Sequence, residues 1–380
     1  MMRKIAVVTS SRADYSHLYW VLREIEAHPE LELHLIAMGP QLSPTFGMPV
    51  SEVEQDGFRI AARIECLLDS NTDVAMAKTI GIATLSLADY LATLRPDLLL
   101  LIADRYEMLA PASVALALRI PVAHIEGGEI TEGAIDDAVR NALTKLSHLH
   151  FTSTEAARQR VISMGEAEWR VHRAGAPSLD HLRRTKLKSR AEIERETGLS
   201  LRVPFLLATY HPVTIAGDTT READAVFRAL AKLPEPIIFC YPNADAGSRD
   251  LIERLRAFTK RHKRAHLLVN LNPVLYWSLL REAFIIAGNS SSGVMEAASF
   301  GVPAVDIGIR QRGRERSKNV LTVDADEAQI LAAIAKARDP DFRRSLAGMA
   351  NPYGDGDAAR RIVKVLASVP LGEELLRKTA

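Results

Sequence analysis

Short apolar runs alternate with longer helical patterns along almost the whole chain. Runs that are apolar throughout are typical of strands in a parallel sheet covered on both faces, and strand–helix–strand order implies right-handed crossovers. The pattern stops in a charged stretch and then begins again. It therefore predicts an α/β protein of two Rossmann-like, doubly wound domains facing across a cleft. The expected strands are residues 4–9, 31–37, 98–103, 121–126 and 148–152 in the first half and 204–210, 236–241, 265–270, 283–289 and 302–308 in the second.

The charged stretch at residues 183–200 lacks a strong apolar stripe, and we place the link between the domains just before it, near Pro177. A last helix, at about 356–368, follows a turn-rich segment and could pack back across the first domain. The predicted divisions are a first domain at 1–177, a second at 178–355 and a C-terminal segment at 356–380. Helices are also expected at 16–28, 76–94 and 107–119.

The charge balance argues against one class of partner. The chain has 48 basic and 47 acidic residues and a formal net charge of +1, so no general attraction to nucleic acid or to an anionic membrane is indicated. Cys66 and Cys240 are far apart in apolar surroundings, which suggests neither disulfides nor zinc and fits a reducing compartment. The first apolar run is too short for a signal peptide, and no apolar stretch approaches the ~20 residues that span a bilayer. We expect a cytoplasmic protein.

Acidic residues follow two neighbouring strands of the first predicted sheet. Asp104 comes directly after one strand, and Glu126 ends the next, before two glycines that would let the backbone approach a ligand closely. Asp136 stands in the first turn of a helix, where an acid also stabilises the helix dipole and can pair with Arg140. Ligands of such sheets bind beyond the carboxyl ends of the strands. Acids that meet there could shift one another's pKa values and divide acid and base roles.

A serine-rich turn joins a strand to a helix in GNSSSGVMEAASFG (288–301). Backbone N–H groups and hydroxyls at the start of a helix can bind phosphate, and an acid one turn later can accept hydrogen bonds from ribose. The same serines could instead only cap the helix. The segment is not a Walker loop, because Gly-Lys-Ser/Thr is missing. The candidate nucleotide-binding residues here are Ser290, Ser291, Ser292, Gly293 and Glu296.

Basic and polar residues follow other strands. Arg12 stands where a dinucleotide-binding domain would have G-x-G-x-x-G, and it could reach a phosphate or a sugar or lie on the surface. His211 ends the first strand of the second domain, and Asn243 ends the next, where a turn role is the alternative. Arg310 opens a basic cluster that could capture an anion or form a solvated loop.

Taken together, these segments resemble the UDP-N-acetylglucosamine 2-epimerase family, and specifically its hydrolysing branch. The resemblance extends from residue 10 to about 356, and its long middle segment is quite specific. Two departures are small: Ala103 stands where the family commonly has a glycine before the acid, and Val213 stands where an acid often occurs. The similar segments are SSRADY, ADRYE, HIEGGEITEGAIDDAVRNALTKLSHLHF, YHPVT, PNADAGS, GNSSSGVMEAASFGVPAVDIGIRQRGRE and NPYGDG.

The resemblance implies the glycosyltransferase-B architecture and a reaction that needs no redox cofactor. The nucleoside diphosphate leaves carbon 1 as the weakly acidic proton on carbon 2 is removed, and water then adds to the 2-acetamidoglycal with inversion at carbon 2. The family's pattern gives the proton transfers to Asp104, Glu126 and Asp136, without assigning the individual steps. His211, Arg12 and Arg310 would balance the diphosphate charge, and Arg105, Ser16 and Asn243 would also line the cleft.

UDP-N-acetylglucosamine is thus the predicted substrate, and UDP and N-acetylmannosamine are the predicted products. The alternative substrate is a UDP- or GDP-linked N,N′-diacetylbacillosamine, because the sequence fixes neither the base nor the substituents at sugar carbons 4 and 6. A non-hydrolysing epimerase, a glycosyltransferase and a nucleotide-sugar-binding regulator are further hypotheses. We expect no metal or other cofactor, no nucleic-acid or membrane partner, and a homodimer formed through the first domain.

Overall fold

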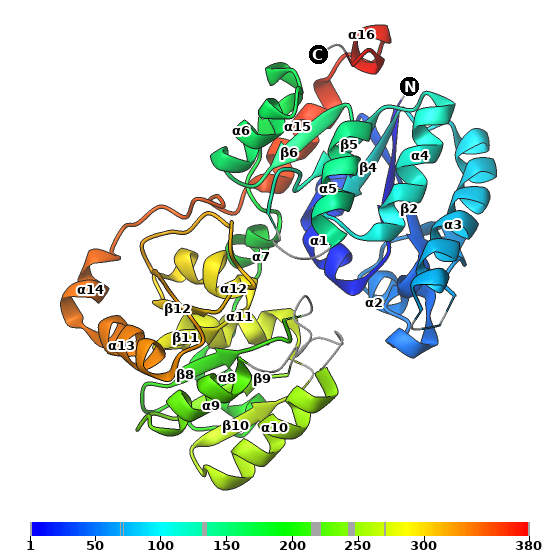
Figure 1. The fold of residues 1–380 in the computed structure, drawn as a ribbon. Coiled ribbons are helices and arrows are strands. Elements are labelled where there is room, and N and C mark those ends of the chain that lie inside the picture. Colours follow the sequence, from blue (N-terminus) through cyan, green and yellow to red (C-terminus); the bar gives the residue numbers. More distant parts are fainter. Residues whose placement is uncertain are drawn as a thin grey trace. The chain divides into compact units, whose positions relative to one another are not determined.

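The computed structural model divides the chain into two compact units (Figure 1). It describes residues 2–68, 70, 72–130, 135–213, 222–241, 248–269 and 271–378. The first unit consists of Met1–Glu129, Ile135–Arg183 and Tyr353–Ala380, and the second is formed mainly by Arg184–Pro352. The chain therefore leaves the first unit after Arg183 and returns to it at Tyr353.

Within the described residues, the first unit contains a seven-stranded parallel sheet in the order β3-β2-β1-β4-β5-β6-β7. The order reverses between β1 and β4, and open α/β sheets bind their ligands at such a switch point. The strands are β1 (Arg3–Thr9), β2 (Leu31–Met38), β3 (Ile60–Ile64), β4 (Leu98–Ile102), β5 (Val122–Ile125), β6 (Leu149–Thr152) and β7 (Val171–Arg173).

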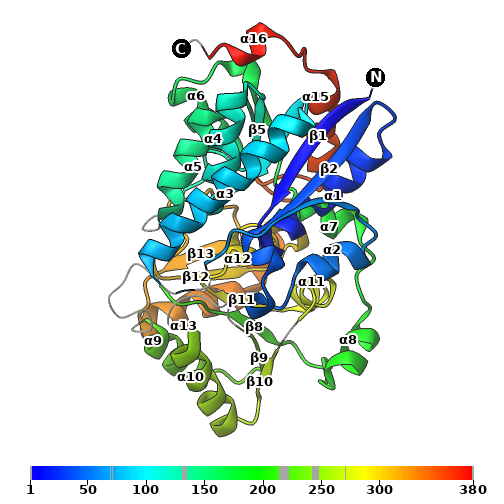
Figure 2. The same cartoon turned by 90° about the vertical axis from the view of Figure 1, so that its right-hand side faces the viewer.

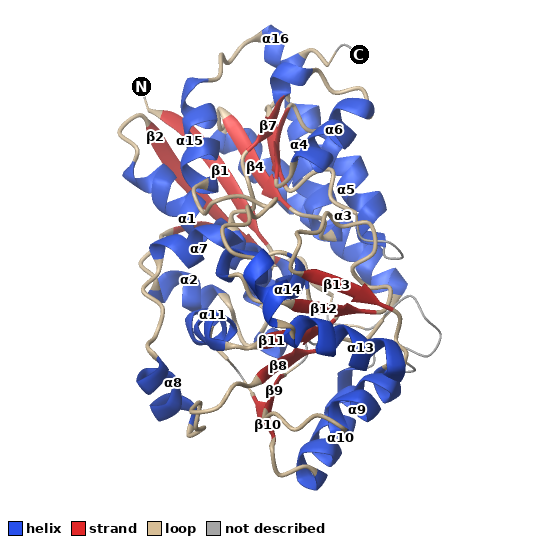
Figure 3. Cartoon of the chain, turned by 90° about the vertical axis from the view of Figure 1, so that its left-hand side faces the viewer, coloured by secondary structure: helices blue, strands red, loops and turns tan. Residues whose placement is uncertain are grey.

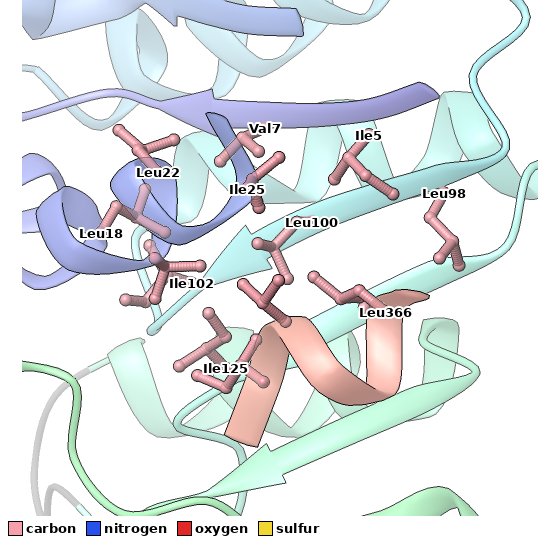
Figure 4. Packing of buried hydrophobic residues seen from close by; sticks show 14 of the residues in the cluster. Ile5, Val7, Leu18, Leu22, Ile25, Leu98, Leu100, Ile102, Ile125 and Leu366 are labelled. Carbon is pink, nitrogen blue, oxygen red and sulfur yellow. The ribbon is translucent and has the colours of Figure 1, made fainter. Parts of the chain in front are cut away.

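Strand β4 is buried on both faces of this sheet. Leu98, Leu100 and Ile102 pack against the helices on one face (Figure 4), and Leu99 and Leu101 pack on the other. All five side chains are fully buried. Because successive side chains of a strand point to opposite faces, a strand with helices on both sides must be apolar throughout. This explains why the sequence has a continuous leucine run here.

Helices from distant parts of the chain share one face of this sheet. Leu18, Leu22 and Ile25 of α1 and Leu366 of α15 belong to the same buried cluster (Figure 4). Helices α3, α4 and α5 cover the other face (Figure 2). The helices are α1 (Arg12–Ala27), α2 (Val50–Gln55), α3 (Asp73–Leu94), α4 (Leu109–Leu118), α5 (Ile135–Leu146), α6 (Glu155–Ser163), α7 (Ser178–Arg184), α15 (Ala358–Ser368) and α16 (Glu373–Leu376).

The second unit repeats this architecture, with a parallel sheet in the order β10-β9-β8-β11-β12-β13 in its described part (Figure 3). Here the order reverses between β8 and β11. The strands are β8 (Leu206–Thr209), β9 (Ile237–Cys240), β10 (Ala265–Leu268), β11 (Ile285–Gly288), β12 (Ala304–Ile307) and β13 (Val320–Val323). The helices are α8 (Arg190–Thr197), α9 (Ala223–Ala231), α10 (Ser248–Arg261), α11 (Pro273–Glu282), α12 (Ser291–Val294), α13 (Glu327–Arg338) and α14 (Pro340–Ser345).

The ten predicted strands are all present, whereas β3, β7 and β13 were not predicted. The prediction that no apolar stretch approaches membrane-spanning length was wrong for α3. This helix has 22 residues and contains an 18-residue window with a mean hydropathy of 1.2, so length and composition alone would allow it to cross a membrane. Core helices of folded domains also meet this criterion, and Ala83, Leu87 and Leu91 of α3 are fully buried. The cytoplasmic location stays a prediction.

Candidate active site

Acidic side chains gather beyond the carboxyl ends of β4 and β5. The two strands are hydrogen-bonded neighbours, with Ile102 in register with Ile125, so Asp104 and Glu126 follow paired residues. The sequence prediction that these two acids stand at adjacent strand ends is therefore confirmed. Both lie at the carboxyl edge of the sheet, near the point where the strand order reverses between β1 and β4.

The backbone is strained at both of these strand ends. Ala103 has a φ of 60° and Glu126 a φ of 65°, in the left-handed region that residues with a Cβ rarely adopt. Hydrogen bonds hold both conformations: the Ala103 N–H donates to Ile125 O (3.0 Å), and the Glu126 N–H donates to Phe151 O (2.8 Å). Strain of about 1–3 kcal/mol per residue persists only where the surroundings enforce it, and it is concentrated at functional sites.

Arg140 of α5 connects the acids of this site. Its side chain is only 3% exposed and forms ion pairs with Asp104 and Asp137, the second at 2.8 Å. The guanidinium also donates to the carbonyl of Glu129 (2.9 Å). Hydrogen bonds between a guanidinium and a carboxylate are charge-assisted and therefore strong and directional. Arg140 therefore fixes the orientation of Asp104 from a different element of the fold.

The surroundings of Asp136 shift its pKa. Burial and the nearby Asp104 carboxylate raise the pKa of Asp136, and the positive charge of Arg140 opposes this shift. A carboxyl group with a raised pKa holds its proton more readily, which suits Asp136 to act as an acid. The predicted convergence of Asp104 and Asp136 is consistent with this coupling.

His124 of β5 supports the turn that carries Asp104. Its Nε2 donates to the Ala103 carbonyl at 2.8 Å. Burial lowers the pKa of His124 to about 4, so the ring is neutral at pH 7. Gly128 is needed for packing within the first unit, because a Cβ there would lie 2.4 Å from the Ala157 carbonyl. An approach of Gly127 and Gly128 to a ligand stays a prediction.

Other predicted residues of the first unit have partners of their own. Arg105 contacts the buried Glu107 at 3.0 Å. Burial opposes its charge, but the carboxylates of Glu107 and Asp14 raise the pKa of Arg105 overall. Arg12 is 68% exposed and contacts Glu52 at 3.3 Å, whereas Ser16 is half-buried in α1. Their role in binding substrate stays a prediction.

We expect Ala103→Gly to stabilise the protein by about 0.5–1 kcal/mol. Relief of the left-handed strain is worth about 1–2 kcal/mol, and the extra freedom of glycine in the unfolded chain costs about 0.5–1 kcal/mol. Urea unfolding would measure the change. As a control, Ala77→Gly at an exposed position inside α3 should cost about 1 kcal/mol. A destabilised Ala103→Gly variant would contradict the strain argument.

In the second unit, Asn289 connects the strand ends of β8 and β11. Its side-chain oxygen accepts from the His211 N–H (2.7 Å), and its amide donates to the His211 carbonyl (2.8 Å). Burial and the nearby Arg310 lower the pKa of His211 to about 3, so the ring is uncharged at pH 7. His211 can therefore offer a hydrogen bond but no full positive charge of its own, which differs from the predicted charge balance.

The serine-rich turn lies beside this strand end. Ser290 caps α12, and its hydroxyl accepts from the Ser292 N–H at 3.4 Å, so the capping alternative is observed for this residue. Glu296 follows α12 and is buried. Arg310 Nη1 donates to the Asn289 carbonyl (3.1 Å), and this basic group therefore lies at the same strand end. Phosphate binding by this turn stays a prediction, and Asn243 lies outside the described residues.

Several residues of these sites were missed by the sequence analysis. His17 of α1 contacts Glu126 (Nδ1–Oε1, 3.0 Å), and Gln311 donates to the Asn289 carbonyl (2.9 Å). The i,i+4 spacing of Asp136 and Arg140 predicts only a pair along the helix, whereas Arg140 is buried and forms ion pairs with Asp104 and Asp137. Among the described residues, no group of three or more His, Cys, Asp or Glu side chains is arranged to hold a metal ion.

Comparisons with known proteins identify the family of the chain. The sequence model of the UDP-N-acetylglucosamine 2-epimerase family matches residues 23–367. A UDP-N,N′-diacetylbacillosamine 2-epimerase (hydrolysing) from Legionella pneumophila is 36% identical over 380 residues, 100% of this chain and 99% of the relative. A GDP/UDP-N,N′-diacetylbacillosamine 2-epimerase (hydrolysing) from Campylobacter jejuni is 34% identical, covering 90% of this chain and 89% of the relative. A UDP-N-acetylglucosamine 2-epimerase from Neisseria meningitidis is 33% identical over 88% of each chain.

Solved structures show the same fold. The UDP-N-acetylglucosamine 2-epimerase from Neisseria meningitidis bound to UDP-N-acetylglucosamine superposes with a TM-score of 0.75 and 19% sequence identity. The match covers 96% of this chain and 99% of that one. Together with the two parallel sheets, this likeness confirms the predicted pair of Rossmann-like domains of the glycosyltransferase-B type.

Proposed function

Because the chain belongs to the UDP-N-acetylglucosamine 2-epimerase family, in its hydrolysing branch, we propose that it is a hydrolysing 2-epimerase of UDP- or GDP-linked N,N′-diacetylbacillosamine. The observation that carries the proposal is the 36% identity to the Legionella relative over the full length of both chains. The products would be the nucleoside diphosphate and the free sugar with inverted configuration at carbon 2. The comparisons thus favour the alternative substrate over the UDP-N-acetylglucosamine first predicted.

The reaction would proceed by elimination and hydration. A base removes the proton on carbon 2 as the bond from carbon 1 to the diphosphate breaks, and its electron pair leaves with the diphosphate. A double bond then joins carbons 1 and 2. In the second half, carbon 2 receives a proton from the opposite face, and water gives hydroxide to carbon 1 and a proton to a base. Both halves require positioned carboxyl groups that change their protonation.

The surroundings of the acids support a division of roles. Asp104 is oriented by its ion pair with the buried Arg140, and we assign it the role of proton acceptor. Asp136, with its raised pKa, is suited to donate one, and Glu126 would serve the remaining transfer. We assign the diphosphate and ribose to Ser290, Ser291, Ser292, Gly293, Glu296, His211 and Arg310 of the second unit. Arg12, Ser16, Arg105 and Asn243 keep their predicted binding roles; the exposed ion pair of Arg12 with Glu52 would cost little to exchange for phosphate.

UDP-N-acetylglucosamine is the second candidate substrate, because a relative of that name covers 88% of this chain at 33% identity. Both candidates undergo the same chemistry at carbons 1 and 2. They differ at carbons 4 and 6. N,N′-diacetylbacillosamine has an acetamido group on carbon 4 and a methyl group as carbon 6, whereas N-acetylglucosamine has a hydroxyl group on each of these carbons. The choice between them therefore depends on contacts away from the reacting carbons.

The test is a product analysis by proton NMR in heavy water. Three nucleotide sugars are supplied separately: UDP-linked N,N′-diacetylbacillosamine, GDP-linked N,N′-diacetylbacillosamine and UDP-N-acetylglucosamine. The proposal predicts that a diacetylbacillosamine nucleotide has the highest kcat/KM and that its released sugar carries deuterium at carbon 2. Faster turnover of UDP-N-acetylglucosamine would favour the second candidate. A product that still carries its nucleotide would overturn the hydrolytic reaction, and no turnover of any of the three would overturn the proposal.

We also retain the homodimer as a proposal, with α3 as its contact surface. Val74 and Leu85 of α3 are 61% and 76% exposed. Lys78 and Asp89 are exposed about three turns apart on the same side of the helix. Two copies of α3 packed antiparallel about a two-fold axis would place each lysine opposite the partner's aspartate. This charge pattern favours a second copy of the chain as the occupant of the surface.

Leu85→Asp is expected to weaken this dimer by at least about 30-fold, because it places a charge at the centre of an apolar contact. Sedimentation equilibrium over a range of concentrations would measure the effect. Val203→Asp is a matched control, since Val203 is an exposed apolar residue of the second unit. A wild-type protein that remains monomeric, or a dimer that Leu85→Asp leaves intact, would rule out α3 as the contact.

A further inference from the structure

We propose that His17 controls the protonation of Glu126, by exchanging a proton between that carboxyl group and bulk water. The inference deepens the proposed function and rests on it, because it concerns one of the three acids of the same site. The observation that supports this inference is the distance of 3.0 Å between Nδ1 of His17 and Oε1 of Glu126. The two residues are far apart in sequence, on α1 and at the end of β5.

The two partners differ in their access to water. The His17 side chain is 32% exposed, whereas the Glu126 side chain is 11% exposed. An imidazole has an ordinary pKa of about 6.5 and two ring nitrogens, so one nitrogen can face a carboxylate while the other exchanges with water. His17 is thus placed to connect an enclosed acid with the solvent.

Glu126 is held rigidly against this histidine. Its backbone has a φ of 65°, and its N–H donates to the Phe151 carbonyl at 2.8 Å. The following residues are packed closely, since even a Cβ at Gly128 would collide with the Ala157 carbonyl. The backbone that carries this carboxyl group is therefore fixed next to the histidine.

The α1 turn that carries His17 is also fixed. Nε2 of His181, on α7, donates to the Ser16 carbonyl (2.7 Å), and Nδ1 of the same ring accepts from Trp20 Nε1 (3.2 Å). These contacts lie on either side of His17 in the sequence. They need a neutral His181, and burial lowers the pKa of His181 to about 4. His17 is therefore presented to Glu126 by a scaffold that does not titrate near pH 7.

The chemistry of the proposed reaction requires such an exchange. If Glu126 takes up a proton in one half-reaction, it must lose that proton before the next turnover, and the reverse applies if it donates one. In the first case, the proton passes from Oε1 to Nδ1 of His17, and Nε2 of His17 releases its own proton to water. No proton or electron is left unbalanced. His17 acts through Glu126, so it is a positioning and proton-exchange residue rather than a catalytic one.

Other titratable groups surround the pair of His17 and Glu126. Glu126 and His124 face the site from β5, and His181 faces His17 from α7. Burial lowers the pKa values of His124 and His181 to about 4, so both rings stay neutral above pH 5. The pKa of Asp136 at the same site is raised, so the signal of the His17 ring itself, rather than the overall pH response of the site, reports on the pair.

The first test is an NMR titration of the full chain with isotope-labelled histidine, in which the His17 signal is assigned by its loss in His17→Asn. We expect Glu126→Gln to lower the pKa of His17 by about one unit, because a neighbouring carboxylate favours the imidazolium. An unchanged pKa would overturn the coupling. This measurement needs no turnover, so it stays decisive even if every candidate substrate is inert and the proposed function fails.

The second test separates proton exchange from a structural hydrogen bond. His17→Asn keeps an N–H donor near the position of Nδ1 but cannot titrate, and His17→Leu removes both properties. Proton exchange predicts that both variants lose at least about 10-fold in kcat with KM changed less than about threefold, and that the pH profile of kcat changes shape. Wild-type kcat and pH profile in His17→Asn would overturn the proposal. His34→Asn is the matched control, because His34 contacts Glu32 at 3.0 Å within β2, outside the candidate site.

Discussion

Replacing Asp104 by asparagine is expected to lower kcat by about 10²–10⁴-fold. The amide side chain would keep the size of the carboxylate but could not accept a proton, and removal of a positioned general base typically costs that much. The effect should appear in kcat more than in KM, because the carboxylate acts on the reacting carbon. Product NMR with the best of the three nucleotide sugars would measure it.

Asp137→Asn is the control for this prediction. Asp137 and Asp104 both form ion pairs with the buried Arg140, so each substitution disturbs the same guanidinium. If Asp104 acts only through Arg140, the two variants should lose similar activity. If Asp104 transfers a proton, Asp137→Asn should keep kcat within about threefold. A protein that binds nucleotide sugars without catalysis would show no turnover in any form and unchanged binding in Asp104→Asn.

The fold was predictable where strands are covered on both faces. The central strand β4 has five fully buried side chains, and its sequence is a continuous apolar run. Strands β3 and β7 are the two edges of the first sheet, and β13 is an edge of the second. Edge strands lack a neighbour on one side and need fewer apolar residues. The sequences IAARI and VHR accordingly gave no strand signal.

Residues of the candidate site were predictable from the sequence only where they stand at the end of a strand. Asp104 and Glu126 stand at strand ends, which a sequence pattern reveals. His17 and Arg140 do not, because their importance comes from contacts between distant segments. His17 lies inside a helical pattern, and its contact with Glu126 joins residues 109 positions apart. The left-handed backbone at Ala103 had one indirect indication in the sequence, because the family that the chain resembles commonly has glycine at this position.

Acidification is expected to destabilise the first unit strongly between pH 7 and pH 5. Burial lowers the pKa values of His124, His148 and His181 to about 4, compared with about 6.5 in an unfolded chain. A lowered histidine pKa means that the unfolded state binds protons first, so stability is full above pH 6.5 and falls as pH decreases towards 4. Each histidine should cost about 2 kcal/mol at pH 5, and three together approach the usual total stability of a domain.

Carboxyl groups change the folding stability mainly at lower pH. Hydrogen bonds and charges from His150, Lys145 and Lys378 outweigh burial and lower the pKa of Glu166 to about 2. Its contribution is therefore lost only as pH falls below the unfolded value of about 4.5. Burial raises the pKa of Asp136, which favours the folded state as pH falls and so opposes the histidines. Urea unfolding at pH 7 and pH 5 would therefore report mainly on the histidines.

His148→Asn isolates one of these three contributions. Nδ1 of His148 accepts from the Val122 N–H at 3.0 Å, and the asparagine oxygen can occupy that place without titrating. The variant should therefore lose about 2 kcal/mol less than the wild type between pH 7 and pH 5, whatever its stability at pH 7. A wild-type protein equally stable at both values would show that these rings are protonated in the fold. A pH dependence unchanged by His148→Asn would instead assign the effect to other buried groups.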